Sequence, residues 1–360
     1  RYARVTGVQT CALPISLSIQ PTTLTIISTY KCTSSCADCC FACNPNRQEK
    51  LSVDDVIKYI SNVLACYSSI KIVVVTGGEC FLLGKGLNRI VRYVRTNGLF
   101  CRVVTNGFWA YSKDVAYKIL SELKEDGLTE INFSTGDDHQ KYVPLQRIFY
   151  GIEVALELGL NVALNIETGN GRHFTLNSLL DSEKFKKFLS PYIYQKPLVV
   201  VQGQWMPFTQ ESLSIMLNDK NIMSAANQGR CVNLFTSVTL SPTKHLFACC
   251  GLPAISINFF DLGFVNVQDD IRAAYECQFD DFLKIWLFTE GPYRILSFIA
   301  NKIGKIPELE YNFHMCFLCA SIFCNEKYLN VLQEHYKEVY SSILLKYFLL
   351  KKQLNHVYSK

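Results

Sequence analysis

From about residue 23 to residue 202 the chain alternates between short apolar runs and longer stretches with apolar residues at every third or fourth position. Nearly continuous apolar runs such as KIVVVT are typical of strands that are buried on both faces of a sheet. Six such runs predict strands at residues 23–29, 71–76, 101–105, 130–134, 161–167 and 198–202. The stretches between them have helical spacing, for example Val56, Ile60 and Val63. Short loops therefore predict successive strand–helix units and a parallel sheet.

This alternation predicts an α/β fold class, in the form of a partial (β/α)6 TIM-like barrel, with an open doubly wound sheet as the alternative. After about residue 213 short cysteine-bearing segments separate aromatic helical stretches, which predicts a smaller cysteine-rich α+β C-terminal domain. We therefore expect a core domain at residues 17–212, a second domain at residues 213–330 and a helical tail at residues 331–360. The lysine-rich tail is typical of a solvated amphipathic helix that packs on its own domain.

The composition describes a folded chain of 360 residues, of which 49% are hydrophobic and 19% charged. The formal net charge of +5 is mild and does not indicate a nucleic-acid partner. No apolar run is long enough to cross a bilayer, and the N-terminus lacks the pattern of a signal peptide. We expect a cytoplasmic protein without a membrane or nucleic-acid partner.

The first residues contain a segment that does not look like natural protein sequence. The segment VTGVQTCALPI, at residues 5–15, matches the in-frame translation of a widely used sequencing-library adapter. We therefore expect residues 1–16 to be an assembly scar, exclude them from fold reasoning and leave Cys11 out of the set of candidate ligands. A natural N-terminal extension is the alternative.

The sixteen cysteines are clustered along the chain. Disulfide-rich secreted folds are short, and no export signal is visible, so the pattern favours thiols that bind metal in a reducing compartment. The densest cluster, KCTSSCADCCFACN, lies at residues 31–44, directly after the first predicted strand. Within it Cys32, Cys36 and Cys39 have the spacing C-x3-C-x2-C. Three thiolates on one loop hold three irons of a [4Fe–4S] cluster and leave the fourth iron without a protein ligand.

This loop has two alternative interpretations. Structural zinc sites normally use two separated pairs of ligands, which this spacing does not provide. Cys36, Cys40 and Cys43 form a second, overlapping match to the same spacing. We prefer the first register because Cys32 follows the strand most closely, and Cys40 and Cys43 are then left without a role.

Three further motifs each follow a predicted strand: TGGEC at residues 76–80, TNG at residues 105–107 and FSTGDDHQ at residues 133–140. Alone, each is a common turn or helix cap. Together, in this order and after the cysteine loop, they resemble the radical S-adenosylmethionine (radical SAM) enzymes over roughly residues 22–210. Asp38 departs from that family, which usually has an aromatic residue before the third cysteine.

The resemblance implies a [4Fe–4S] cluster and S-adenosylmethionine as cofactors. The reduced cluster would break a carbon–sulfur bond and give a 5′-deoxyadenosyl radical, which takes a hydrogen atom from the substrate. The implied cofactor-binding residues are Gly77, Gly78, Glu79, Asn106, Ser134 and Asp137. Asn165 and Glu167 are weaker candidates, His139 is more typical of a structural hydrogen-bonding residue, and no side chain is assigned a catalytic role.

A second cysteine set lies downstream. SPTKHLFACCG, at residues 241–251, and HMCFLCASIFCN, at residues 314–325, resemble the SPASM and twitch auxiliary domains of radical SAM enzymes. Lys244 replaces the usual glycine, one spacing is short and one cysteine is absent. We therefore expect one auxiliary [4Fe–4S] cluster, with structural zinc as the alternative. Its four ligands are expected among Cys231, Cys249, Cys316, Cys319 and Cys324.

The sequence therefore predicts a radical SAM enzyme, an oxidoreductase or a peptide-modifying enzyme, that acts on a peptide, a protein or a small molecule. An electron donor such as flavodoxin or ferredoxin would reduce the cluster. The alternatives are a non-catalytic iron–sulfur protein on the same scaffold and a zinc-stabilised interaction protein.

Overall fold

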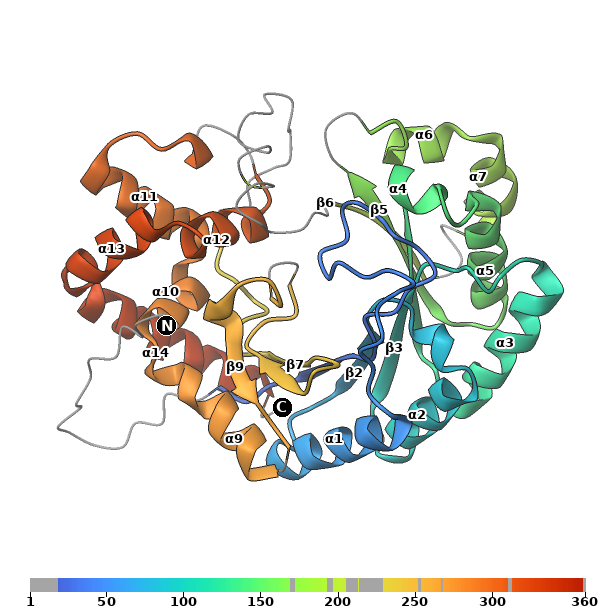
Figure 1. Cartoon of the computed structure of the whole chain (residues 1–360), viewed down its shortest axis with the longest axis horizontal. Helices are drawn as coiled ribbons and strands as arrows, with labels where there is room; N and C mark the ends of the chain where they lie inside the picture. Colours follow the sequence, from blue (N-terminus) through green and yellow to red (C-terminus); the bar gives the residue numbers. More distant parts are fainter. Residues whose placement is uncertain are drawn as a thin grey trace. The chain divides into compact units, whose positions relative to one another are not determined.

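The computed structural model describes residues 19–168, 172–192, 197–204, 213, 229–251, 254–266, 268–309 and 313–358. The predicted adapter segment, residues 1–16, lies outside them. The chain forms two compact units (Figure 1). We call Thr22–Pro207 with Thr239–Lys244 the sheet unit, and the remainder, with Phe208–Val238 and His245–Lys360, the helical unit. The predicted domain boundaries stay predictions.

The sheet unit is built on six parallel strands in the order β6-β5-β4-β3-β2-β1, and every neighbouring pair is parallel. The strands are β1 (Thr23–Ile27), β2 (Ile72–Thr76), β3 (Phe100–Thr105), β4 (Glu130–Thr135), β5 (Asn161–Thr168) and β6 (Leu198–Gln204). The predicted α/β fold with a parallel sheet is confirmed.

Helices connect these strands and lie along the outer side of the curved sheet (Figure 1). The longer helices are α1 (Val53–Cys66), α2 (Lys85–Thr96), α3 (Lys113–Asp126) and α5 (Leu145–Glu157). The shorter ones are η1 (Cys80–Leu83), α4 (Asp137–Gln140), α6 (Leu176–Asp181), α7 (Glu183–Phe188) and η2 (Ser190–Tyr192). Helix α1 has a side-chain cap, because Ser52 Oγ accepts a hydrogen bond from the Asp55 amide at 3.0 Å.

The two faces of this sheet differ because side chains alternate along each strand. One face is apolar: the register sets Val75 beside Val103 and Phe133 beside Leu164, and all four are fully buried. Phe133 packs at Gly151 of α5, so this face contacts the helices. The opposite, inner face carries polar side chains, including Thr25, Arg102, Asn132 and Asn165. The strand ends on that side therefore border a polar surface.

The helical unit combines short strands with a helical bundle. The strands β8 (His245–Phe247) and β9 (Asp261–Phe264) pair in antiparallel fashion. Strand β7 (Ser237–Leu240) begins in this unit, and its last two residues belong to the sheet unit. The α-helices are α9 (Gln268–Glu276), α10 (Phe282–Glu290), α11 (Pro292–Ile303), α12 (Met315–Phe323), α13 (Glu326–His335) and α14 (Tyr340–Tyr358). Single 3-10 turns are η3 (Asn258–Phe260), η4 (Cys277–Asp280), η5 (Pro307–Leu309) and η6 (Tyr336–Glu338).

Aromatic packing forms the core of the helical unit. Phe235 contacts Phe279, Phe288 and Tyr347, with ring centroids 4.6, 5.2 and 6.2 Å away. Tyr347 belongs to α14, so the predicted tail contributes a fully buried ring to this core. None of the described helices combines the length and apolar character that crossing a bilayer requires.

Candidate metal and cofactor site

The cysteine loop, residues 32–44, follows β1, and the chain then returns to lie beside the end of that strand. The amide of Tyr30 donates to the Glu49 carbonyl at 2.9 Å, and the amide of Leu51 donates to Ser28 at 2.9 Å. Further along, the amide of Cys32 donates to Asn44 at 3.1 Å. These bonds close the base of the loop, so residues 32–44 form a compact projection at the carboxyl end of β1.

The three predicted ligands on this loop influence one another electrostatically. Burial, followed by the charges of Glu79 and then of the Cys39 thiol, raises the pKa of Cys32 to about 11. Burial and the neighbouring thiols raise the pKa of Cys36 to about 12. In contrast, a hydrogen bond with the Cys43 thiol lowers the pKa of Cys39 to about 6. Close thiols that resist ionisation need a compensating cation before they all become thiolates, as metal ligands do.

Hydrogen-bond donors are directed at two of these sulfur atoms. The amide of Ser34 lies 3.4 Å from Cys32 Sγ, and the side-chain amide of Asn106 lies 3.6 Å from the same atom. The amide of Cys43 lies 3.4 Å from Cys39 Sγ. Donors of this kind stabilise negative charge on sulfur and tune iron–sulfur clusters.

The spacing of the sulfur atoms bears on the kind of metal. In a tetrahedral zinc site with Zn–S bonds of about 2.3 Å, the sulfurs lie about 3.8 Å from one another. Among the described residues, no three cysteine sulfurs lie within 4.8 Å of one another. The described thiols are therefore not already gathered at the separations of a tetrahedral zinc site.

Two adjacent glycines bring the end of β2 against the start of the cysteine loop. The amide of Gly78 donates to the Thr29 carbonyl at 2.7 Å. A Cβ atom on Gly77 would lie 2.4 Å from that oxygen, and one on Gly78 would lie 2.2 Å from the Lys31 carbonyl oxygen. Gly77 also has φ of +135°, which side chains rarely allow. Only glycine therefore permits this backbone approach.

Glu79 joins the ends of β2 and β3 through a buried carboxyl group. It accepts hydrogen bonds from the Thr105 hydroxyl at 2.9 Å, the Asn106 amide at 2.8 Å and the Phe81 amide at 3.0 Å. Its side chain is fully buried, and this burial raises its pKa to about 7. Asn106 in turn donates through its side chain to Thr33 Oγ1 at 3.0 Å. Residues from two predicted motifs thus connect to the cysteine loop.

The other two predicted contacts lie at the end of β4. Ser134 is buried on the inner face, where the register sets it beside Asn165. Asp137 accepts a hydrogen bond from the His173 amide at 2.6 Å and from the Phe174 amide at 3.2 Å. Asp137 therefore fixes the segment after β5, and a contact of either side chain with a cofactor stays a prediction.

Sequence reasoning missed a charged cluster beside the loop. Arg172 Nη2 lies 2.7 Å from Glu167 Oε1 and also contacts the Asp38 carboxylate. The amide of Asp38 donates to Asp138 Oδ2 at 3.2 Å, and His139 Nδ1 lies 3.0 Å from Glu167 Oε2. The acidic residue at position 38, where the family has an aromatic one, was the available signal that a charged partner exists.

The second cysteine set meets in the helical unit. A small apolar pocket there is lined by Cys231, Leu234, Cys249, Phe260, Leu287, Pro292, Met315, Cys316 and Cys319. Burial raises the pKa of Cys249 and of Cys319 well above the ordinary value, with further contributions from nearby thiols. Four of the five predicted ligands therefore share one pocket.

Helix α12 explains which cysteines meet there. Its N-cap residue His314 accepts the Cys316 amide at 3.2 Å, so the helix begins just before the first cysteine. Cys316 and Cys319 are one turn apart and share a face. Cys324 is the C-cap at the far end of the helix, and it is not among the residues that line the pocket.

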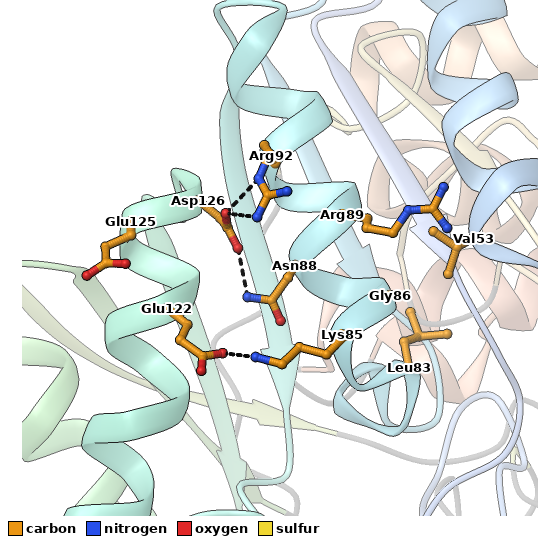
Figure 2. A pocket seen from close by; sticks show the side chains of 10 residues that line it. All are labelled: Val53, Leu83, Lys85, Gly86, Asn88, Arg89, Arg92, Glu122, Glu125 and Asp126. Carbon is orange, nitrogen blue, oxygen red and sulfur yellow. Dashed lines mark hydrogen bonds and ion pairs between the residues drawn. The ribbon is translucent and has the colours of Figure 1, made fainter.

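An open pocket also lies on the outer side of the sheet unit, between α2 and α3 (Figure 2). Its basic side chains have acidic partners: Lys85 pairs with Glu122, and Arg92 lies 2.7 Å from Asp126. The charges are largely compensated, so this surface offers no strong attraction to a charged ligand.

This chain is similar to known proteins in sequence and in structure. No protein-family model matches the chain. It is 20% identical over 332 residues to the "Putative peptide biosynthesis protein YydG" of Bacillus subtilis (strain 168), over 89% of this chain and 97% of that protein.

Among solved structures, native anSMEcpe with bound AdoMet and Cp18Cys peptide is similar with a TM-score of 0.50 and 12% identity, over 92% of this chain and 99% of that chain. Streptococcus suis SuiB bound to precursor peptide SuiA gives a TM-score of 0.37 and 13% identity, over 64% of this chain and 60% of SuiB. The chain thus spans less than two thirds of SuiB. The likeness to anSMEcpe covers nearly all of both chains, and the two share a fold.

Proposed function

We propose that this chain, which has the fold of the radical SAM enzymes, binds a [4Fe–4S] cluster through Cys32, Cys36 and Cys39 and uses S-adenosylmethionine to remove a hydrogen atom from a peptide. One observation carries the proposal. A loop with these three thiols, with N–H donors directed at its sulfurs, lies against the double-glycine end of β2.

When bound, the cluster and S-adenosylmethionine supply the electron and the carbon radical that the reaction needs. The side chains of this protein position them. Asn106 orients the loop and donates to Cys32 Sγ, and Glu79 holds Asn106 in place through its backbone amide. Gly77 and Gly78 leave backbone surface open beside the loop, and Ser134 adds a polar group on the inner face.

A peptide is the substrate class that the comparisons support. The curated relative is named as a putative peptide biosynthesis protein, and both anSMEcpe and SuiB have solved structures with a peptide bound. On the inner face, Val199 and Val201 of β6 are 57% and 41% exposed. A surface with both apolar and polar groups suits a peptide side chain and its backbone.

The helical unit adds a second metal site to the proposal. Cys231, Cys249, Cys316 and Cys319 are the favoured ligands because they line one pocket, whereas Cys324 lies at the other end of α12. A second [4Fe–4S] cluster is preferred to zinc because the proposed cluster on the cysteine loop already requires iron–sulfur loading of this chain. An acidic electron donor such as flavodoxin or ferredoxin suits the formal net charge of +5.

The test uses the full chain, purified and reconstituted with iron and sulfide under anaerobic conditions. With S-adenosylmethionine and dithionite, the protein should be brown and should release methionine and 5′-deoxyadenosine. Cys36→Ala should abolish this release and keep the absorbance of the second cluster. Cys40→Ala is the matched control, because it lies on the same loop outside the preferred register.

Three outcomes would contradict the proposal. Full release of 5′-deoxyadenosine by Cys36→Ala would eliminate the ligand assignment. A colourless protein with zinc in place of iron would identify a zinc-stabilised protein. An iron-loaded protein that does not cleave S-adenosylmethionine would identify a non-catalytic iron–sulfur protein.

A further inference from the structure

Three carboxyl groups from separate parts of the sheet unit converge beside the cysteine loop. Asp38 belongs to the loop, Asp138 to α4 and Glu167 to the end of β5, and one oxygen of each lies within 4.8 Å of the others. Asp138 and Glu167 are almost completely buried, with side chains 2% and 1% exposed. Three acidic groups this close repel one another unless a cation compensates them.

Arg172 supplies that cation and reaches all three groups. Its Nη2 atom lies 2.7 Å from Glu167 Oε1 and contacts the Asp38 carboxylate, while Nη1 lies 3.5 Å from Asp138 Oδ1. The side chain is only 16% exposed. A planar guanidinium group presents five donors in a fixed fork, which suits several carboxylates at once better than the compact ammonium group of lysine.

The backbone around Arg172 is also fixed. Both amides that follow it, those of His173 and Phe174, donate to the Asp137 carboxylate at the end of β4. Two interactions fix the cysteine loop at Asp38. Its carboxylate pairs with Arg172, and its backbone amide donates a hydrogen bond to Asp138. Asp38 lies between Cys36 and Cys39, so these contacts act on the part of the loop that carries two predicted ligands.

We propose that Arg172 is a positioning residue that latches the cysteine loop to the ends of β4 and β5 through Asp38, and that it offsets the acidic charge beside Cys36. Arg172 lies close enough to Cys36 to interact with it electrostatically. The latch orders the spacing between Cys36 and Cys39 before a metal binds. The inference depends on the proposed function in one respect, which is that Cys36 and Cys39 bind a cluster.

The first test measures hydrogen exchange of the amides of residues 32–44 in the metal-free, full-length chain. Arg172→Gln should exchange about tenfold faster than the wild type, because the loop opens more often. Asp38→Asn should have a similar effect. Arg172→Lys should fall between, since it retains the charge and loses the planar fork.

Lys141→Gln is the matched control. Lys141 also pairs with Asp138, but its side chain is 63% exposed. It is the C-cap residue of α4, three positions after Asp138, so this pair does not connect α4 to the cysteine loop. Its exchange profile over residues 32–44 should equal that of the wild type. The double variant Arg172→Gln with Asp38→Asn should exchange no faster than either single variant, because both changes break the same contact.

The second test follows reduction of the reconstituted cluster by electron paramagnetic resonance. Without Arg172 the three carboxylates beside Cys36 keep only the partial compensation that Lys141 gives Asp138, so adding an electron becomes less favourable. At the midpoint potential of the wild type, the reduced fraction of Arg172→Gln should fall from one half to about one quarter or less. Arg172→Lys should keep a midpoint close to that of the wild type.

Unchanged exchange in Arg172→Gln, or additive effects in the double variant, would overturn the latch. Faster exchange with an unchanged midpoint would overturn the electrostatic part. The exchange measurement does not depend on a cluster. Faster exchange in Arg172→Gln would therefore support the latch even if the reconstituted chain bound no iron. The failure to bind iron would refute the proposed function alone.

Discussion

At the scale of single residues, Glu79 combines a fully buried carboxyl group with three hydrogen-bond donors. The donors favour the ionised form and burial favours the neutral form, and burial prevails, since the pKa rises from 4.5 to about 7. Glu79 therefore stabilises the fold most when it is protonated. This assigns the residue a structural role in joining β2 to β3.

The pH dependence of stability tests this role. Below pH 4.5 Glu79 is protonated in both the folded and the unfolded chain, so its contribution is fully present. Between pH 4.5 and about 7 the unfolded chain ionises first, and the free energy of unfolding should fall by about 3 kcal/mol in total. Glu79→Gln should lack this fall. Urea unfolding of the metal-free chain at several pH values checks it, and parallel pH profiles for the two proteins would contradict it.

Residue patterns predicted only part of the candidate site. Cys32, Cys36, Cys39, Gly78 and Glu79 are recognisable because each lies within a short motif after a strand. Arg172 could not be recognised in this way. Its partners are far away in sequence, and only the strand order and the path of the segment after β5 bring them together.

At the scale of elements, the alternation of apolar and polar positions predicted all six strands of the sheet unit within a few residues. Strand β2 shows the reason. Its three consecutive valines are buried, and a continuous run of β-branched residues is typical of a strand that is covered on both faces. The short helix α4 was not predicted, because four residues carry no helical period.

The contact between the end of β2 and the cysteine loop provides an element-scale prediction. Gly78→Ala would set a Cβ atom 2.2 Å from the Lys31 carbonyl, so the two segments must separate. We expect a loss of about 1–3 kcal/mol in stability, together with loss of iron from the first site. Urea unfolding and iron analysis measure both.

Gly98→Ala is the control for that prediction. Gly98 has open space around it and a φ of +72°. It should therefore cost only about 1 kcal/mol for the left-handed backbone and keep its iron. Equal iron loss in both variants would show that the close approach at Gly78 is not what holds the site together.

At the scale of the whole molecule, the chain has two compact units, each with its own cysteine set. The sulfur pocket of the helical unit is lined by residues of that unit alone. The two sites should therefore respond separately to substitution.

Cys249→Ser tests this separation. It should remove the proposed metal of the helical unit and lower the thermal stability of that unit, because metal binding contributes to folding. Hydrogen exchange of residues 32–44 should stay at the wild-type level. Native mass analysis with hydrogen exchange makes both measurements, and a faster exchange in the cysteine loop would contradict the separation.

The hydrogen bond from the Asp38 amide to Asp138 also has a consequence for biosynthesis. Its two partners are 100 positions apart in the chain. At a synthesis rate of about 5–20 residues per second, the thiols of the loop leave the ribosome about 5–20 seconds before the partner that orders them. During that interval the thiols are exposed to oxidation and to other metal ions. On the proposed function, iron loading would therefore follow the synthesis of β4 and α4.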